Sequence, residues 1–203
     1  MTEPAQPQRL DGRRLRSERS KQSILDACEA LMLEGHLVPT AQMISDKAGV
    51  PIRTFFRHYP DMETLFLAVD EAMRPRYLKI YEESVSQGSL EERIAGAVEL
   101  HAQSYEENRA VIQSTKAQLW RYPVLQENYA RVTRRLRKDL DMRIPELLEV
   151  DRDTREAIDA IASVEMWMRL RHHQSLSRKK SKRIIRSSIQ LILTTALEST
   201  SDD

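Results

Sequence analysis

The chain has 203 residues, which is enough for one or two domains with a substantial core. Its 32 lysines and arginines nearly balance its 31 aspartates and glutamates, so the composition excludes a globally basic protein that coats nucleic acid without regard to sequence. The single cysteine excludes a disulfide within the chain. Together with the lack of an apolar leader or membrane-spanning run, it predicts a cytoplasmic protein.

Few glycines, few aromatic residues and the absence of alternating apolar runs predict an all-α protein. Residues 1–15 contain Pro4, Pro7, Gly12 and several arginines, which indicates a mobile basic arm. Two interpretations of this arm stay open: a disordered tail, or an arm that reaches into a DNA minor groove.

The spacing of apolar residues over 17–34 predicts the first helix, which ends at Gly35. Cys28 lies on its apolar stripe, so we expect a core residue rather than a reactive thiol. The stripe comprises Ile24, Leu25, Cys28, Leu31 and Met32.

Residues 40–59 have the pattern of two short helices joined by a tight turn. Thr40 suits the N-cap, because its hydroxyl can accept a hydrogen bond from a backbone amide one turn later. Gly49 supplies the left-handed backbone that ends the first of these helices. Pro51 has the fixed φ that suits the first turn of the second.

The second short helix buries Phe55 and Tyr59 and leaves Ile52, Arg53 and Arg57 facing outward. Two helices in this arrangement are typical of a helix-turn-helix, whose second helix enters a DNA major groove.

The flanks of the motif carry a resemblance to a known family. The segments ILDACEALMLEG and ISDKAGVPIRTFFRHYPDMETLF, between about Arg16 and Met73, resemble the DNA-binding domain of the tetracycline-repressor (TetR) family of bacterial transcription regulators. The resemblance implies a three-helix helix-turn-helix domain over residues 16–62, with a linking helix from residue 62. It also implies a C-terminal helical domain for ligand binding and dimerisation over residues 63–203.

The resemblance further implies which side chains meet DNA. Gln42, Ile52 and Arg53 take positions near base edges, and Arg53 could bind a guanine through two hydrogen bonds. Thr54 and His58 take positions near phosphates. The implied DNA-binding set is Thr40, Gln42, Ile52, Arg53, Thr54, Arg57, His58 and Tyr59.

Four positions depart from the family pattern. Ala41 replaces a threonine, Pro51 a serine or threonine, Phe56 a tyrosine and Met62 a lysine. Pro51 leaves the second helix without a side-chain cap, and Met62 removes a positive charge from the phosphate contacts. Because of these departures, we expect the arginine-rich arm to supply more of the phosphate contacts.

Beyond the motif, Asp61 caps the next helix, which we expect Pro75 to kink or interrupt before it continues toward Gly88. Ser89 and Glu92 form a capping box that opens another helix. A later basic amphipathic helix presents several arginines, which we expect to form a solvated face.

Two long helices finish the chain, over about 153–173 and 178–198. Each is apolar over more than one stripe, so each needs cover on two sides. The chain's own core supplies one side, and a second copy would supply the other, which predicts a homodimer. The expected interface residues are Ile161, Met168, Ile185, Ile189, Ile192 and Leu193.

Aromatic, soft or weakly polar residues recur in the implied C-terminal domain. We expect some of them to line a largely apolar ligand pocket, and ordinary core packing is the alternative interpretation. The candidates are Tyr77, Tyr81, His101, Tyr105, Trp120, Met166 and Trp167.

The sequence contains no phosphate loop, nucleotide fingerprint, paired metal ligands or nucleophile with an evident base, so we expect neither an enzyme nor a cofactor or metal site. The favoured function is a sequence-specific DNA-binding transcription regulator, a repressor that a small hydrophobic ligand releases from its operator. The alternatives are a DNA-binding regulator without a small-molecule inducer and, further removed, a helical-bundle enzyme. The expected partners are double-stranded operator DNA, a second copy of the chain and the small ligand, with no membrane.

Overall fold

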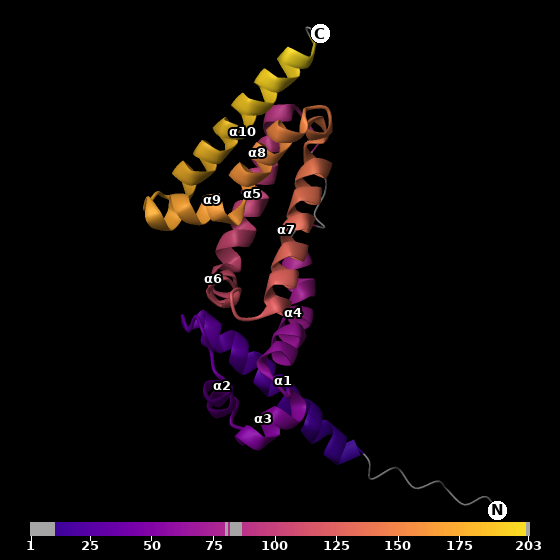
Figure 1. The fold of residues 1–203 in the computed structure, drawn as a ribbon, viewed down its shortest axis with the longest axis vertical. Helices are drawn as coiled ribbons and strands as arrows, with labels where there is room; N and C mark the ends of the chain where they lie inside the picture. Colours follow the sequence, from indigo (N-terminus) through magenta and orange to yellow (C-terminus); the bar gives the residue numbers. More distant parts are fainter. Residues whose placement is uncertain (1–10, 80, 82–86, 202–203) are drawn as a thin grey trace, which may run out of the picture. The chain divides into compact units, whose positions relative to one another are not determined.

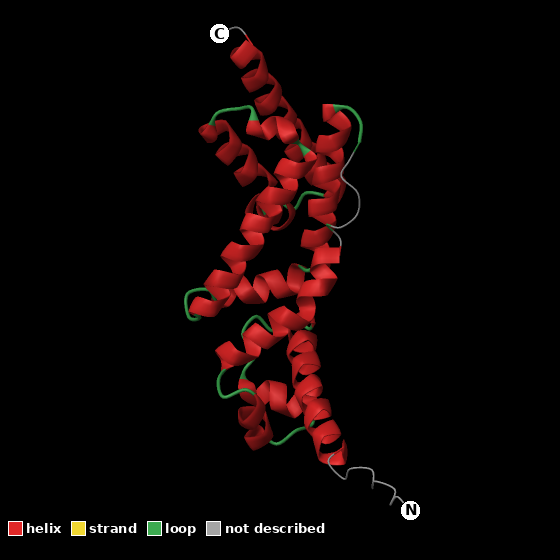
Figure 2. Cartoon of the chain, turned by 90° about the vertical axis from the view of Figure 1, so that its right-hand side faces the viewer, coloured by secondary structure: helices red, strands yellow, loops and turns green. Residues whose placement is uncertain are grey.

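The computed structural model describes residues 11–79, 81 and 87–201, and every regular element among them is a helix (Figure 2). The all-α class predicted from the sequence is confirmed. These residues divide into two compact units. The first comprises the chain up to Met73 together with Ala110–Gln126, and the second comprises Arg74–Arg109 and the chain from Glu127 onward. The chain therefore passes between the units three times.

The first unit contains the three helices drawn from indigo to purple in Figure 1, with parts of three more. The second of these helices and the third both contact the first, as the predicted helix-turn-helix domain requires. The elements are α1 (Asp11–Leu33), α2 (Ala41–Ala48), α3 (Ile52–His58), the start of α4 (Met62–Lys79), most of α6 (Arg109–Gln118) and the start of α7 (Pro123–Arg143).

α1 begins at Asp11 rather than at residue 17, so residues 11–15 of the predicted arm are helical. The remainder of that arm, residues 1–10, lies outside the described residues. The predicted stripe is buried except at Leu25, which is half-buried. Burial, and to a smaller degree Glu29, raises the pKa of the Cys28 thiol to about 12, so Cys28 is the unreactive core residue that was predicted.

The caps of α2 are those predicted from the sequence. The hydroxyl of Thr40 accepts a hydrogen bond from the Met43 amide at 3.3 Å. Gly49 has a φ of 66°, and its N–H donates to the carbonyls of Ser45 and Asp46. A residue with a Cβ rarely adopts this backbone, which explains the glycine at the turn.

α3 follows Pro51, which provides no side-chain hydrogen bond to the helix, as predicted. Phe55 and Tyr59 are buried, with their ring centroids 6.2 Å apart. Burying two aromatic side chains one turn apart fixes which face of this short helix points outward.

α4 begins behind Asp61, whose carboxylate accepts a hydrogen bond from the Thr64 amide at 2.7 Å. Hydrogen bonds from the Thr64 amide and hydroxyl lower the pKa of Asp61. Of the two outcomes predicted at Pro75, a kink or an interruption, the interruption does not occur, because α4 continues through the proline. Pro75 and Glu71, whose carbonyl loses its helical partner, are both exposed, so water can reach that carbonyl. The continuation predicted toward Gly88 falls largely outside the described residues.

In the second unit, α10 lies against both α5 and α8 (Figure 1). Ser89 and Glu92 form the predicted capping box at the start of α5. The elements are α5 (Leu90–Glu107), most of α7 (Pro123–Arg143), η1 (Pro145–Leu148, a 3₁₀ turn), α8 (Arg152–Ala162), α9 (Val164–Met168), η2 (Arg169–His173, a π-helical turn) and α10 (Arg178–Ser201).

The single helix predicted over about 153–173 is wrong, because the chain there forms α8, α9 and η2. Ser163 has an extended backbone, and its hydroxyl accepts a hydrogen bond from the Met166 amide at 3.2 Å. Serine is a favoured cap, so this bond competes with continuation of the helix. The hydroxyl of Tyr105 donates to the carbonyl of Ala162 at 2.9 Å, which satisfies a carbonyl at the break.

Several elements of the second unit meet at the carboxylate of Glu106. It accepts hydrogen bonds from Trp167 Nε1 at 3.2 Å, Arg171 Nε at 2.8 Å and Arg178 Nη2 at 3.0 Å. Burial alone would raise the pKa of Glu106, but the two guanidiniums hold it below its ordinary value. Glu106 thereby ties α5 to α9, η2 and α10.

Candidate functional site

The outward face of α3 carries two arginines and an aliphatic side chain. Arg53 and Arg57 are exposed, and neither forms an ion pair with an acid in the described part of the chain. Ile52 and Thr54 lie beside them and are half-buried. A guanidinium can donate two parallel hydrogen bonds to guanine O6 and N7, and an aliphatic group can contact a thymine methyl. This face therefore has the chemistry to read bases.

Two members of the predicted DNA-binding set lie inside the unit instead. Tyr59 is 1 % exposed, and burial raises the pKa of its enclosed hydroxyl to about 12. His58 is half-buried, and its Nε2 is enclosed with no hydrogen-bond partner among the described residues. Burial, and then the charges of Arg57 and Lys21, lower the pKa of His58. A neutral, half-buried imidazole offers a phosphate little positive charge.

A second cationic surface of the first unit lies along α1. The charge of Lys21 acts on His58, as does that of Glu18, which places this part of α1 near the C-terminal end of α3. Asp11, an acid at the start of the helix, is the sequence signal that could have revealed the extension of α1. The exposed cations of this surface are Arg13, Arg14, Arg16, Arg19 and Lys21.

The two predicted contacts on or before α2 are already engaged within the chain. Thr40 uses its hydroxyl to cap the helix. Gln42 is exposed, but its Nε2 donates to Asp46 Oδ1 at 2.8 Å. A base contact through this amide nitrogen would therefore require Asp46 to release it.

α6 is joined to the loop between α1 and α2 by buried polar groups. The Ser114 hydroxyl and Gln118 Nε2 both donate to the carbonyl oxygen of Leu37, at 3.0 and 3.2 Å. Ser114 is 1 % exposed and Gln118 is 2 % exposed, so breaking these bonds would leave buried polar groups unsatisfied. Only Asn108 separates α6 from α5 in the chain. No sequence pattern distinguished these two residues from solvated ones.

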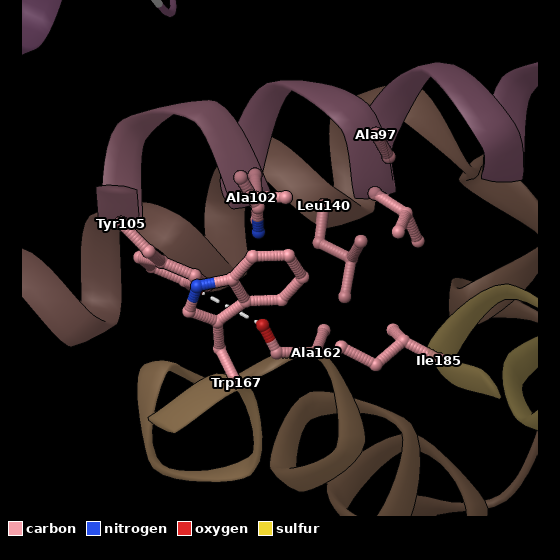
Figure 3. A pocket seen from close by; sticks show the side chains of 9 residues that line it. Ala97, Ala102, Tyr105, Leu140, Ala162, Trp167 and Ile185 are labelled. Carbon is pink, nitrogen blue, oxygen red and sulfur yellow. Dashed lines mark hydrogen bonds between the residues drawn. The ribbon is translucent and has the colours of Figure 1, made fainter. Parts of the chain in front are cut away.

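A small cavity lies in the second unit (Figure 3). Its free space of about 10 Å³ is close to what one water molecule needs. Drug-sized ligands occupy pockets of roughly 300–1,000 Å³, so such a ligand would have to move the surrounding helices apart. The mostly apolar lining comprises Ala97, Val98, His101, Ala102, Tyr105, Leu140, Ala162, Trp167 and Ile185.

His101 belongs to a buried polar network beside this cavity. Its Nε2 lies 3.0 Å from Asp139 Oδ2, and Arg143 Nε donates to the same oxygen at 2.9 Å. Burial alone would raise the pKa of the Asp139 carboxyl, but hydrogen bonds from His101 and Arg143 hold it below its ordinary value. The i, i+4 spacing of Asp139 and Arg143 could have revealed the pair in the sequence. The other arginines of α7 had instead led to the prediction that this part of the helix faces solvent.

The structure brings together part of the predicted ligand set. Tyr81 does not line the cavity, but its ring meets that of His101 edge to face, with centroids 5.8 Å apart. Tyr77 and Met166 are half-buried and do not line it. Trp120 belongs to the first unit and is 79 % exposed. The predicted residues that do line the cavity are His101, Tyr105 and Trp167.

The predicted dimer residues divide into two groups. Ile161, Met168 and Ile192 are half-buried and retain surface for a partner. Leu191, which the sequence analysis omitted, is 70 % exposed on α10. The other predicted residues are at most 4 % exposed and pack in the core of their own unit; they are Ile185, Ile189 and Leu193.

The described residues contain no group of three or more histidines, cysteines, aspartates or glutamates that could hold a metal ion. In the same part of the chain, no helix combines the length and the apolar character needed to cross a bilayer.

The buried network generates a prediction for Asp139→Asn. The substitution removes the carboxylate that His101 and Arg143 share and should lower the free energy of unfolding at pH 7 by about 1–3 kcal/mol. The pKa of Asp139 is depressed in the folded state, so its stabilisation is present above the unfolded pKa of about 3.9 and is lost as pH falls through the folded pKa. The difference in free energy of unfolding between the unmodified protein and the Asp139→Asn variant, measured by urea unfolding, should therefore become smaller below about pH 4.

The matched control is Asp153→Asn, in the exposed first turn of α8, which should change the unfolding free energy by less than about 0.5 kcal/mol. If Asp139→Asn cost the same at pH 7 as in acid, the ionised carboxylate would not be the stabilising form.

Two solved structures similar to this chain are transcription regulators. A transcriptional regulator from Rhodococcus sp. Rha1 superimposes with a TM-score of 0.64 and 14 % sequence identity, covering 89 % of this chain and 97 % of its own. A TetR transcription regulator from Haloarcula marismortui ATCC 43049 gives a TM-score of 0.61 and 16 % identity, covering 88 % of this chain and 98 % of its own. No protein-family model matches the chain, and the comparison with curated proteins gives no match either. The chain thus has the fold of TetR-type transcription regulators.

Proposed function

We propose that this protein is a sequence-specific DNA-binding transcription regulator that inserts α3 into a major groove. The observation that carries the proposal is the outward face of α3, with Arg53 and Arg57 exposed above the buried Phe55 and Tyr59. The left-handed turn at Gly49 sets the angle between α2 and α3. The similarity to solved transcription regulators supports the same function.

Within this interface, Arg53 reads a guanine and Ile52 contacts a thymine methyl, while Thr54 lies toward phosphates. The cations of α1 supply most of the phosphate contacts. Two observations support this division: His58 has a lowered pKa and is half-buried, and Met62 places no positive charge at the start of α4.

We further propose that the protein is a repressor whose operator affinity falls when a small hydrophobic ligand enters the second unit. α5 contributes His101 and Tyr105 to the cavity lining and continues through Asn108 into α6. α6 is bonded to the Leu37 carbonyl between α1 and α2. Because the cavity holds only about 10 Å³ of free space, a ligand cannot enter without displacing these helices. A displacement of α5 would therefore be carried along the chain to α6.

The proposed regulator acts as a homodimer through the surfaces of α8 to α10 that its own core leaves uncovered. These are the half-buried Ile161, Met168 and Ile192 and the exposed Leu191. Two copies related by a two-fold axis would place two α3 helices in successive major grooves, about 34–36 Å apart.

Selection of binding sites from a random DNA pool tests the function. We expect the unmodified protein to enrich one operator sequence and Arg53→Ala to lose discrimination at one base pair per half-site, worth about 1–3 kcal/mol. Arg134→Ala, which removes an exposed arginine from α7, is the control and should keep the full preference. Failure of the unmodified protein to enrich any sequence would refute sequence-specific binding.

A thermal-shift screen of small hydrophobic compounds, followed by operator titration, tests the ligand switch. A compound that stabilises the protein should weaken operator binding by about 5–150-fold, which is a coupling of about 1–3 kcal/mol. Val98→Phe fills the cavity and should abolish the shift, whereas Leu100→Phe on the same helix, outside the lining, should retain it. A compound that needs the cavity but leaves operator affinity unchanged would contradict the switch.

Sedimentation at micromolar concentration tests the dimer. We expect a dimer that Leu191→Glu or Ile192→Glu weakens, because either change places a charge on the uncovered face of α10. Leu148→Glu is the control, since Leu148 of η1 is also an exposed leucine, at 62 %, and should leave the dimer intact. A monomeric unmodified protein would count against this proposal.

A further inference from the structure

The chain carries a concentrated positive segment outside its helix-turn-helix. From residue 166 to residue 197 the sequence contains no aspartate or glutamate. The structure describes this whole segment, which forms part of α9, η2 and most of α10. The lysines and arginines within it are Arg169, Arg171, Arg178, Lys179, Lys180, Lys182, Arg183 and Arg186.

One face of α10 uses its cations to hold the helix in place. Arg178, Lys182 and Arg186 lie at i, i+4 and i+8, so they share a face of the helix. Each binds a glutamate of α5: Arg178 reaches Glu106 at 3.0 Å, Lys182 reaches Glu99 at 2.6 Å, and Arg186 reaches Glu91. These three ion pairs explain part of the positive charge as structural.

Lys179, Lys180 and Arg183 are not explained in this way. All three are exposed, and none forms an ion pair with a described acid. Their spacing places them together on a face of α10 that is different from the ion-pair face. We call these three residues the α10 cation cluster.

The α10 cation cluster opposes the stability of the helix that carries it. Lys179 and Lys180 lie in the first turn of α10, where the helix dipole disfavours positive charge. Lys179 and Arg183 stand at i, i+4, where like charges repel. The preceding backbone is also irregular, with the π-helical turn η2 and a φ of 52° at Ser175. Such departures from local preference concentrate at functional surfaces.

The surroundings of the α10 cation cluster indicate the kind of partner. No large apolar side chain is exposed between residues 169 and 187, all of which are described. A membrane surface would require apolar residues beside the cations, and a protein interface would require apolar or aromatic anchors. The exposed neighbours without a formal charge are instead Gln174, Ser175, Ser177 and Ser187, with the imidazoles of His172 and His173. Lysine, arginine, serine and glutamine are the side chains that contact nucleic-acid phosphates.

We propose that the α10 cation cluster is a second DNA-contacting surface, which binds the phosphates of duplex DNA without regard to sequence. It is separate from α3 and lies in the other compact unit. The proposal rests on the proposed function only in taking duplex DNA as the polyanion.

The test compares two triple variants of the full-length protein for binding to a labelled duplex of random sequence. One variant is Lys179→Ala/Lys180→Ala/Arg183→Ala. The other is Arg134→Ala/Arg135→Ala/Lys138→Ala, which removes the same charge from the exposed face of α7. Fluorescence anisotropy gives the affinity between about 50 and 200 mM salt, and the slope of log affinity against log salt counts phosphate contacts.

We expect the α10 variant to bind more weakly and to lose about 0.9 from the slope for each phosphate contact removed. The variant Lys179→Arg/Lys180→Arg keeps the positive charge of the cluster and should show the same salt slope as the unmodified protein. The α7 variant should show that slope as well. Equal slopes for all the proteins, or equal losses in the two triple variants, would overturn the proposal. Loss of binding to phosphatidylserine vesicles with unchanged DNA binding would overturn it in favour of a membrane surface. Operator preference is measured separately with Arg53→Ala, so failure of the cluster and failure of the helix-turn-helix give different results.

Discussion

The second unit depends on the charge of Glu106, because one carboxylate holds three donors that come from separate elements. Arg171 and Arg178 neutralise it, and Trp167 donates its indole N–H to it. Trp167 therefore faces the cavity in a fixed orientation, and α10 begins at a fixed position on α5. The ion pairs of Lys182 and Arg186 extend the same attachment along α10. The cations on that face of α10 therefore stabilise the fold, whereas those of the α10 cation cluster do not take part in these ion pairs.

The connection from cavity to recognition helix would depend on a different kind of contact. Ser114 and Gln118 are uncharged, and they bind one backbone oxygen, that of Leu37, away from water. A buried neutral hydrogen bond contributes only about 0.5–1.5 kcal/mol when made but costs more when broken without a substitute. Such a contact would suit a switch, because α6 and the loop between α1 and α2 would move together as long as these hydrogen bonds stay intact. The narrow cavity beside α5 means that ligand entry and helix movement would be one event.

Local signals predicted local structure well, and tertiary packing decided the rest. Thr40, Gly49 and the Ser89–Glu92 capping box act through backbone bonds within a few residues, so their roles were visible in the sequence. Ser163 is also a cap, but the apolar pattern continues on both sides of it and hid the break between α8 and α9. For α10 the sequence pattern showed apolar residues on more than one side of the helix, but it did not show which side packs against the core of the same chain. Ile189 was therefore assigned to a partner, and the structure buries it within the unit. The spacing of Phe55 and Tyr59 correctly predicted that α3 buries both rings and leaves Arg53 exposed, although the family resemblance also placed the buried Tyr59 in the DNA-binding set.

Net charge conceals the electrostatic organisation of this chain, because acids and bases of nearly equal number are placed unevenly along it. The exposed cations on α1, on α3 and in the α10 cation cluster act over a Debye length of about 8 Å at physiological salt. Phosphate contacts carry no base information, so cations on α1 and α10 would strengthen specific and non-specific binding by the same factor. They would speed the search for an operator without changing which operator is chosen. Under the proposed function, discrimination between sequences would then fall to the few side chains on the outward face of α3, and above all to Arg53. Such a division would explain how a helix as short as α3, with one aliphatic and two cationic outward side chains, could select an operator.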